Sequence, residues 1–294
     1  MFRSKEDGRS RQTTFDDALE DELARRLELD QLLRSALDRG EFEVHYQPEF
    51  DLVSGRVLGA EALLRWRRGG ELVPAAEFIG TIETTGLIEQ VGRWVLQTAC
   101  EQAARWCEGS TDSSFVIRVN LAARQLDRPD LAEQVAEVLQ ASGLTPDRLC
   151  LEVTETALMN QPEVAAASLN ELDALGVELA IDDFGTGYSS LSYLKMFPLD
   201  VLKIDRCFVS GLPGDVQDSA IVRSVIDLAG ALGMVVTAEG VEVAAQADAL
   251  VSLGCRRAQG YLFARPVHAD EVTRMLAEGS LSGARSARAG ASRR

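Results

Sequence analysis

Two adjacent carboxylates, Asp182 and Asp183, are the most distinctive chemical feature of the sequence. They follow the apolar run Val177–Ile181, and a turn with two glycines and a pair of serines completes the segment Asp182–Ser190. Neighbouring negative charges repel each other and are costly to bury without a cation. The order of strand, acidic pair, tight loop and helix start therefore indicates a metal site at the carboxyl end of a strand. For the pair alone, a solvated turn is the alternative.

Polar residues recur where the other apolar runs end. In chain order they are Gln47, Glu61 with Arg65, Asn120, Glu152 with Glu155, Lys203 with Asp205, Glu239 with Glu242, and Gln259. Each has an ordinary explanation by itself, such as a helix cap, a surface ion pair or a turn residue. Carboxylates in this number cannot be buried together without compensation. A cluster of acids with one lysine is typical of a two-metal site that clamps both oxygens of a phosphoryl displacement.

Spacing within the strands supports this interpretation. Glu61, Leu63 and Arg65 alternate along one strand and therefore face the same side. Glu61 can reach a metal, while the planar fork of Arg65 suits a phosphate further out. Lys203 lies within an apolar strand, so it points into the fold and needs a partner. We expect it to hold a water or to neutralise charge beside the metals; pairing with Asp205 is the structural alternative.

Composition limits the functions that the chain can have. Its 294 residues are 46% hydrophobic and 26% charged, with a net charge of −16. That charge does not suit non-specific binding to polymeric nucleic acid or to an anionic membrane. Five scattered cysteines and two histidines argue against a disulfide framework, a zinc site or histidine catalysis, and favour a cytoplasmic location. Any metal should be held by oxygen, which points to Mg²⁺ or Mn²⁺. No membrane segment or signal peptide is indicated.

The elements that must position these residues alternate between β-type runs and helical segments. The β-type runs are Phe42–Tyr46, Val57–Arg65, Phe115–Asn120, Leu149–Val153, Val177–Ile181, Val201–Ile204, Met234–Ala238 and Ala258–Leu262. The helical segments are Pro74–Cys107, Asp130–Ser142, Pro162–Leu175, Ser189–Phe197, Val216–Leu232 and Val243–Leu253. Four of these helices should stop at Gly143, Gly176, Gly233 and Gly254.

Eight strands in this alternation predict an α/β fold, a (β/α)8 barrel, with an open doubly wound sheet as the alternative. The first two strands are joined only by Gln47–Arg56, which is too short for a helical crossover. They should be antiparallel, so we expect a modified TIM-like barrel with one antiparallel strand. Catalytic groups of a barrel lie where strands end, which would bring the polar residues together.

The ends of the chain differ in composition from the barrel. Residues 16–40 have a helical apolar period with an exposed face, which predicts a connecting helix. Residues 1–15 have no core of their own. Residues 279–294 are rich in serine, glycine, alanine and arginine, which predicts a disordered tail. The barrel should therefore occupy residues 41–278.

Taken in order, the short motifs resemble the EAL domain family, the cyclic-di-GMP phosphodiesterases of bacterial signalling. The matching stretches are Tyr46-Gln47-Pro48, Glu61-Ala62-Leu63, Val119-Asn120-Leu121, Leu151–Glu155, Asp182–Ser190, Val201–Phe208, Ala238–Glu242 and Gln259-Gly260-Tyr261. The resemblance extends from about residue 32 to residue 275. Each motif is weak alone, but their order and spacing together are specific. Ala122 departs from the serine that is usual in the family.

The resemblance implies a TIM-like barrel that hydrolyses cyclic di-GMP to linear pGpG by in-line attack of a metal-bound water. It implies two Mg²⁺ or Mn²⁺ ions, with inhibition by Ca²⁺. The implied metal ligands are Glu61, Asn120, Glu152, Asp182, Asp183 and Glu239. Lys203, Glu239 and Glu61 would be catalytic; Gln47, Leu63, Arg65, Gln259 and Glu242 would bind substrate; and Glu155 would stabilise the Asp182–Ser190 loop. The general base is open between Glu239 and metal hydroxide.

Three further interpretations follow from the same residues. The first fifteen residues resemble the end of a GGDEF domain, so the chain could be a fragment or short form of a GGDEF–EAL protein. A homodimer through the helix after the Asp182–Ser190 loop is common in the family, and the sequence neither shows nor excludes it. The rival functions are a non-catalytic receptor or scaffold, and another metal-dependent phosphohydrolase on a barrel.

Overall fold

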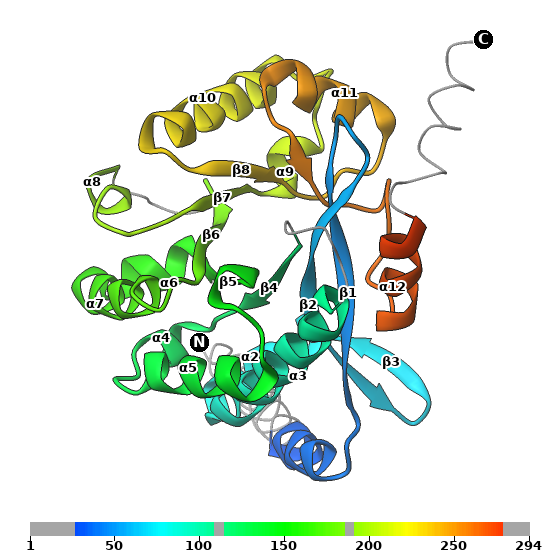
Figure 1. Ribbon diagram of the computed structural model, residues 1–294, viewed down its shortest axis with the longest axis vertical. Coiled ribbons are helices and arrows are strands. Elements are labelled where there is room, and N and C mark those ends of the chain that lie inside the picture. Colours follow the sequence, from blue (N-terminus) through cyan, green and yellow to red (C-terminus); the bar gives the residue numbers. More distant parts are fainter. Residues whose placement is uncertain (1–26, 109–114, 186–190, 279–294) are drawn as a thin grey trace, which may run out of the picture. The chain divides into compact units, whose positions relative to one another are not determined.

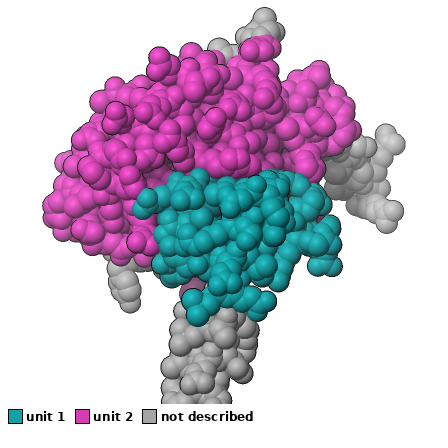
Figure 2. Space-filling view, turned by 90° about the horizontal axis from the view of Figure 1, so that it is seen from below, with its two compact units in different colours: residues 1–43, 65–91 teal, residues 44–64, 92–294 magenta. Residues whose placement is uncertain are grey.

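The computed structural model describes residues 27–108, 115–185 and 191–278. The GGDEF-like remnant, the start of the connecting helix and the predicted disordered tail lie outside these residues. Contacts divide the chain into two compact units, residues 1–43 with 65–91 and residues 44–64 with 92–294 (Figure 2). The domain boundaries given above stay a prediction.

The strands are β1 (Phe42–Asp51), β2 (Val57–Arg68), β3 (Glu71–Pro74), β4 (Val116–Asn120), β5 (Leu149–Thr154), β6 (Glu178–Phe184), β7 (Val201–Ile204), β8 (Val235–Ala238) and β9 (Arg257–Ala258). Residues 27–38 are helical, and the helices that follow are α2 (Ile79–Thr85), α3 (Ile88–Cys107), α4 (Ala123–Leu126), α5 (Leu131–Ser142), α6 (Glu155–Asn160), α7 (Pro162–Asp173), α8 (Leu191–Leu194), α9 (Arg206–Val209), α10 (Val216–Leu232), α11 (Ala244–Leu253) and α12 (Ala269–Glu278). Single 3-10 turns are η1 (Ala75–Glu77) and η2 (Pro146–Arg148).

The strands form one closed barrel. Their order is β1-β9-β8-β7-β6-β5-β4-β2-β3, and β1 also pairs with β2, so eight of the described strands close on themselves and β3 is an extra edge strand. Each neighbouring pair from β2–β4 through β8–β9 is parallel, whereas β1 runs antiparallel to β9. The predicted barrel with one antiparallel strand is confirmed, and the open sheet is wrong.

The parallel strands at the centre of the sheet are mostly buried, because the barrel interior and the outer helices cover their two faces. The residues of β7 are all buried, and those of β5 are buried except at Thr154. Helix α10 packs beside β7 and β8, on the outside of the barrel (Figure 1). It ends at Gly233, whose left-handed backbone accommodates the turn, as the sequence predicts. None of the helices within residues 27–108, 115–185 and 191–278 has the length and apolar character of a membrane-spanning segment.

The first unit has its own apolar centre. The rings of Phe42, Trp66 and Phe78 contact one another, and the indole of Trp66 donates a 3.0 Å hydrogen bond to Glu41. Strand β3 was not predicted. Its turn is Gly69-Gly70, and both glycines have positive φ angles, of 59° and 91°. That pair is a signal for a tight hairpin turn that could have been found in the sequence.

Four predicted elements need correction. The first strand does not end at Gln47 but runs on to Asp51. The single helix predicted over Pro74–Cys107 is interrupted, because Gly86 adopts a left-handed conformation and ends α2. The last strand is only Arg257–Ala258, since the chain turns after it. Of the helix predicted over Ser189–Phe197, the described part is helical at Leu191–Leu194. Helices α4, α6, α9 and α12 were not predicted.

Candidate active site

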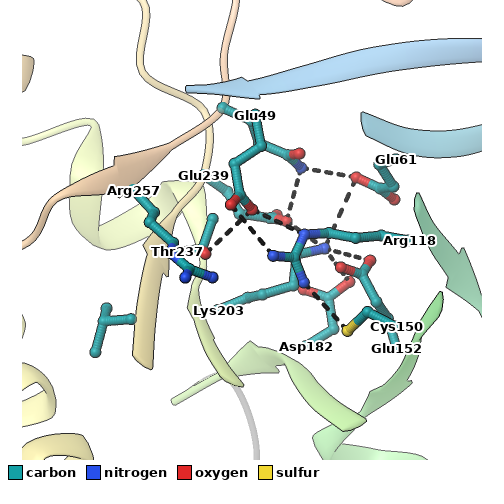
Figure 3. A network of polar contacts seen from close by, with 12 residues as sticks. Glu49, Glu61, Arg118, Cys150, Glu152, Asp182, Lys203, Thr237, Glu239 and Arg257 are labelled. Carbon is teal, nitrogen blue, oxygen red and sulfur yellow. Dashed lines mark hydrogen bonds and ion pairs between the residues drawn. The ribbon is translucent and has the colours of Figure 1, made fainter. Parts of the chain in front are cut away.

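The ammonium group of Lys203 is the centre of a buried acidic cluster in the second unit. Lys203 projects from β7 and is fully buried. Its Nζ lies 2.6 Å from Glu152 Oε2, 2.6 Å from Glu239 Oε1, 3.1 Å from Asp182 Oδ2 and 3.7 Å from Glu61 Oε2 (Figure 3). The four carboxylates come from β2, β5, β6 and the end of β8. The parallel strands thus bring together residues that are far apart in the sequence.

Two amides complete the cluster around Glu61. Asn120, the last residue of β4, donates a 2.7 Å hydrogen bond to Glu61 Oε1. Gln259 donates to Glu61 Oε2 at 2.7 Å and to Glu239 Oε1 at 2.9 Å. Both oxygens of Glu61 therefore accept hydrogen bonds, which holds this carboxylate in one orientation.

The acidic pair lies inside β6 rather than after it. Successive residues of a regular strand point to opposite faces. Here the pairing of β6 with β7 shifts between Ile181 and Phe184, and Asp183 has a left-handed backbone with φ of 55°. As a result Asp182, Asp183 and Glu239 each offer an oxygen, all within 4.8 Å of one another. A local irregularity thus lets neighbouring aspartates serve one site.

Glu155 contacts the segment that follows the acidic pair. It is the first residue of α6 and is buried, and its Oε2 accepts a 2.8 Å hydrogen bond from the backbone of Gly185. Gly185 has φ of 95°, and a Cβ built there would lie 2.9 Å from the ring of Phe208. Position 185 therefore requires glycine for two reasons. Residues 186–190 of the loop lie outside the described part of the chain.

The cluster fits divalent metal ions that prefer oxygen ligands. Glu61, Glu152, Asp182, Asp183 and Glu239 with Lys203 carry a formal charge of −4, which two divalent cations would neutralise. Within the described residues, Glu152 Oε1 and Gln259 Oε1 are buried without a hydrogen-bond partner. Oxygen atoms of this kind are what Mg²⁺ and Mn²⁺ bind.

The pKa values of the cluster reflect burial and crowding. Burial raises the pKa of Glu239 to about 8, with the charges of Asp182 and Glu61 adding to the rise. Burial likewise raises the pKa of Glu152 well above its ordinary value. The pKa of Lys203 also rises well above its usual value, because four surrounding carboxylates outweigh the effect of burial. Without metal, Lys203 is thus charged and the acids compete for protons.

These shifts predict how the metal-free protein responds to pH. A carboxyl whose pKa is raised by folding stabilises the fold at low pH, and this contribution is lost as the pH rises through the folded value. For Glu239 the loss extends from its ordinary value of 4.5 to about 8. We expect thermal unfolding in EDTA to show a Tm several degrees lower at about pH 8.5 than at about pH 6. The difference should shrink in Glu239→Gln; an equal Tm for the wild type at both pH values would contradict this assignment.

The other predicted substrate-binding residues lie on different elements of the fold. Gln47 is in the middle of β1, and it donates a 3.2 Å hydrogen bond to the carbonyl of Ala264. Because β1 is antiparallel, its carboxyl end lies at the opposite rim from those of the other strands. Leu63 is partly exposed on β2, and Glu242 is exposed after β8. Arg65 lies on the part of β2 that belongs to the first unit.

The alternative in which Asp205 pairs with Lys203 is wrong. Asp205 instead caps α9, where its Oδ1 accepts a 2.8 Å hydrogen bond from the backbone of Cys207. A buried polar pair, Glu49 and Arg118, was not among the predicted site residues. The signal was present, since each lies two residues from a predicted site residue on the same strand.

The chain is similar to known proteins over most of its length. The model of the EAL domain family matches residues 30–266. An uncharacterized protein of Synechocystis is 42% identical over 92% of this chain and 39% of its own length. The bifunctional diguanylate cyclase/cyclic di-GMP phosphodiesterase MucR of Pseudomonas aeruginosa is 40% identical over 94% of this chain and 40% of its own. The chain thus spans about two fifths of these relatives.

A solved structure resembles nearly all of the described fold. The phosphodiesterase PaMucR in complex with c-di-GMP is 42% identical and has a TM-score of 0.80. The match covers 83% of this chain and 99% of that chain. Its barrel therefore corresponds to the barrel described here.

Proposed function

Because the chain belongs to the EAL domain family, we propose that it is a metal-dependent phosphodiesterase that hydrolyses cyclic di-GMP to linear pGpG. The observation that carries this proposal is the convergence of the carboxylates and amides around Lys203. A receptor that only binds the nucleotide would not need so complete a set of ligands. The five cysteines, all free, agree with a reducing, cytoplasmic setting.

The cluster supports a specific assignment of metal ligands. Glu61, Asn120, Glu152 and Asp182 would hold one ion, and Asp182 would be shared with a second ion that Asp183 also holds. Glu239 and Gln259 would complete the second site. The bound cations supply the positive charge that stabilises the phosphoryl oxygens and makes a water molecule more acidic.

The residues of the chain then have separate tasks in the reaction. Lys203 orients the attacking water, since its ammonium group is fixed among the carboxylates. Glu239 would be one candidate to accept a proton from that water, since its Oε1 lies 2.6 Å from the Lys203 ammonium group. Water adds to phosphorus with loss of one proton, the bond from phosphorus to the 3′ oxygen breaks, and that oxygen takes up a proton to become a 3′ hydroxyl, while the phosphate stays on the 5′ oxygen of pGpG. Gln47, Leu63, Arg65 and Glu242 would contact the nucleotide.

The proposal is tested by incubating the purified chain with cyclic di-GMP and separating the products by anion-exchange chromatography. With Mg²⁺ or Mn²⁺ we expect conversion to pGpG. EDTA should stop the reaction, and Ca²⁺ should inhibit it because its looser coordination misplaces the attacking water. Binding of cyclic di-GMP without turnover in either metal would identify a receptor. Undiminished turnover in EDTA would contradict the metal dependence.

A further inference from the structure

A second layer of polar side chains lies next to the acidic cluster, towards the amino ends of the parallel strands. We call it the lower layer; its members are Glu49, Arg118, Cys150 and Thr237 (Figure 3). On three strands each member precedes a residue of the cluster by two positions: Arg118 before Asn120, Cys150 before Glu152, and Thr237 before Glu239. Residues two apart on a strand face the same side, about 7 Å from each other. The lower layer is therefore one step deeper in the barrel.

The lower layer contains a fully buried ion pair. Arg118 Nε lies 2.8 Å from Glu49 Oε2, and Arg118 Nη2 donates a 3.2 Å hydrogen bond to Glu49 Oε1. The side chains of Arg118 and Glu49 are 1% and 0% exposed. Thr237 also donates to Glu49, at 3.2 Å, and Arg118 Nη1 donates to Cys150 Sγ at 3.1 Å. One hydrogen bond and one close ion-pair contact thus join the two side chains, and the pair is neutral overall, so it adds no net charge beneath the cluster.

Arg118 has a second carboxylate close to it. The guanidinium contacts Cys150, and Glu152 is the next residue of β5 on the same face. Glu152 is buried, and within the described residues its Oε1 has no hydrogen-bond partner. Burial raises the pKa of Glu152, and the positive charges of Lys203 and, to a smaller extent, Arg118 oppose this rise. Two buried carboxylates, Glu49 and Glu152, thus compete for one guanidinium.

The outcome of this competition matters to the metal site. A guanidinium stays charged inside proteins, and a buried charge without a partner is costly. If Glu49 lost its charge, Arg118 would turn to the oxygens of Glu152. A carboxylate engaged by arginine in this way has fewer electron pairs to offer a cation.

We propose that Glu49 is a positioning residue that sequesters Arg118 and thereby keeps Glu152 free to bind metal. This inference rests on the metal site in the proposed function. It assigns a role to an ion pair that lies outside the proposed set of metal ligands and substrate-binding residues. It also explains why a carboxylate lies so deep in a barrel that already contains an excess of acids.

The test is a titration of the full chain with Mn²⁺, following free Mn²⁺ by electron paramagnetic resonance. In Glu49→Gln the shape of the side chain is kept and the charge is lost. We expect its Mn²⁺ dissociation constant to rise roughly 10- to 100-fold. In the double variant Glu49→Gln/Arg118→Met the competing guanidinium is also gone, and Mn²⁺ binding should return toward the wild-type value. Thr237→Val is the matched control: it removes a hydrogen bond to Glu49 but no charge, and should bind Mn²⁺ like the wild type.

The outcomes separate the inference from the proposed function. If the wild type bound no Mn²⁺, the metal site and the proposed function would both fail. Wild-type affinity in Glu49→Gln, with Mn²⁺ bound normally by the parent, would overturn the sequestering role alone. The sequestering role would also be overturned if the double variant bound Mn²⁺ as weakly as Glu49→Gln, since loss of packing would then explain the weak binding of both variants. Should Glu49→Gln not fold, as judged by circular dichroism, the double variant decides, because it leaves no buried charge unpaired.

Discussion

The variant Glu61→Gln should lose cyclic-di-GMP hydrolysis by about three orders of magnitude, as when roughly 4 kcal/mol of transition-state stabilisation is removed. Both oxygens of Glu61 accept hydrogen bonds, from Asn120 and from Gln259. The amide of glutamine would direct an NH₂ group at one of these donors and would remove one negative charge from the metal site. The measurement is the initial rate of pGpG formation at saturating Mn²⁺.

The matched control is Glu171→Gln, the same chemical change at an exposed position of α7. It should hydrolyse cyclic di-GMP at the wild-type rate. Thermal unfolding of both variants separates a catalytic loss from misfolding. A well-folded Glu61→Gln enzyme with normal turnover would remove Glu61 from the proposed set of metal ligands.

Replacing Lys203 with methionine should have the second large effect, on stability as well as on activity. Lys203 is within 4 Å of four carboxylates, and it is fully buried. Removing one partner of a buried ion network leaves the others uncompensated and typically costs about 3–5 kcal/mol. In EDTA we therefore expect a strongly lowered Tm, more so at high pH, where the acids cannot relieve the repulsion by taking up protons.

Mn²⁺ should raise the Tm of Lys203→Met by more than it raises that of the wild type, because the cations replace the missing positive charge. Hydrolysis should stay absent, since the proposed partner of the attacking water is gone. Lys195→Met, at an exposed lysine directly after α8, is the control and should behave like the wild type. An unchanged Tm in EDTA for Lys203→Met would show that the cluster does not depend on this ammonium group.

Much of this arrangement could be predicted from local features of the chain. Alternation of β-type runs with amphipathic helices determines a parallel barrel, and parallel strands necessarily bring their carboxyl ends to one rim. For that reason Glu152 and Asp182 could be assigned to one cluster from the sequence. The antiparallel direction of β1 was also predictable, because its connection to β2 is too short for a helix.

The tertiary structure alone decided which polar groups pair. Lys203 and Asp205 are close in the sequence, yet the lysine contacts carboxylates of other strands while Asp205 caps a helix. Glu49 and Arg118 are 69 positions apart, and only the closed barrel makes them a buried pair. The physical reason is that a buried charge takes whichever partner the closed fold places beside it, and that choice depends on strands distant in the chain.

The acidic pair depends on both the local sequence and the tertiary structure. The residue types of Asp182 and Asp183, with Gly185 two residues further on, determine that this strand end carries negative charge and can turn sharply. That both side chains serve one site depends on the shift between β6 and β7 and on the left-handed backbone of Asp183. Neither is visible in the sequence, since pairing with a distant strand produces the shift, and the surrounding structure holds Asp183 in its unusual conformation.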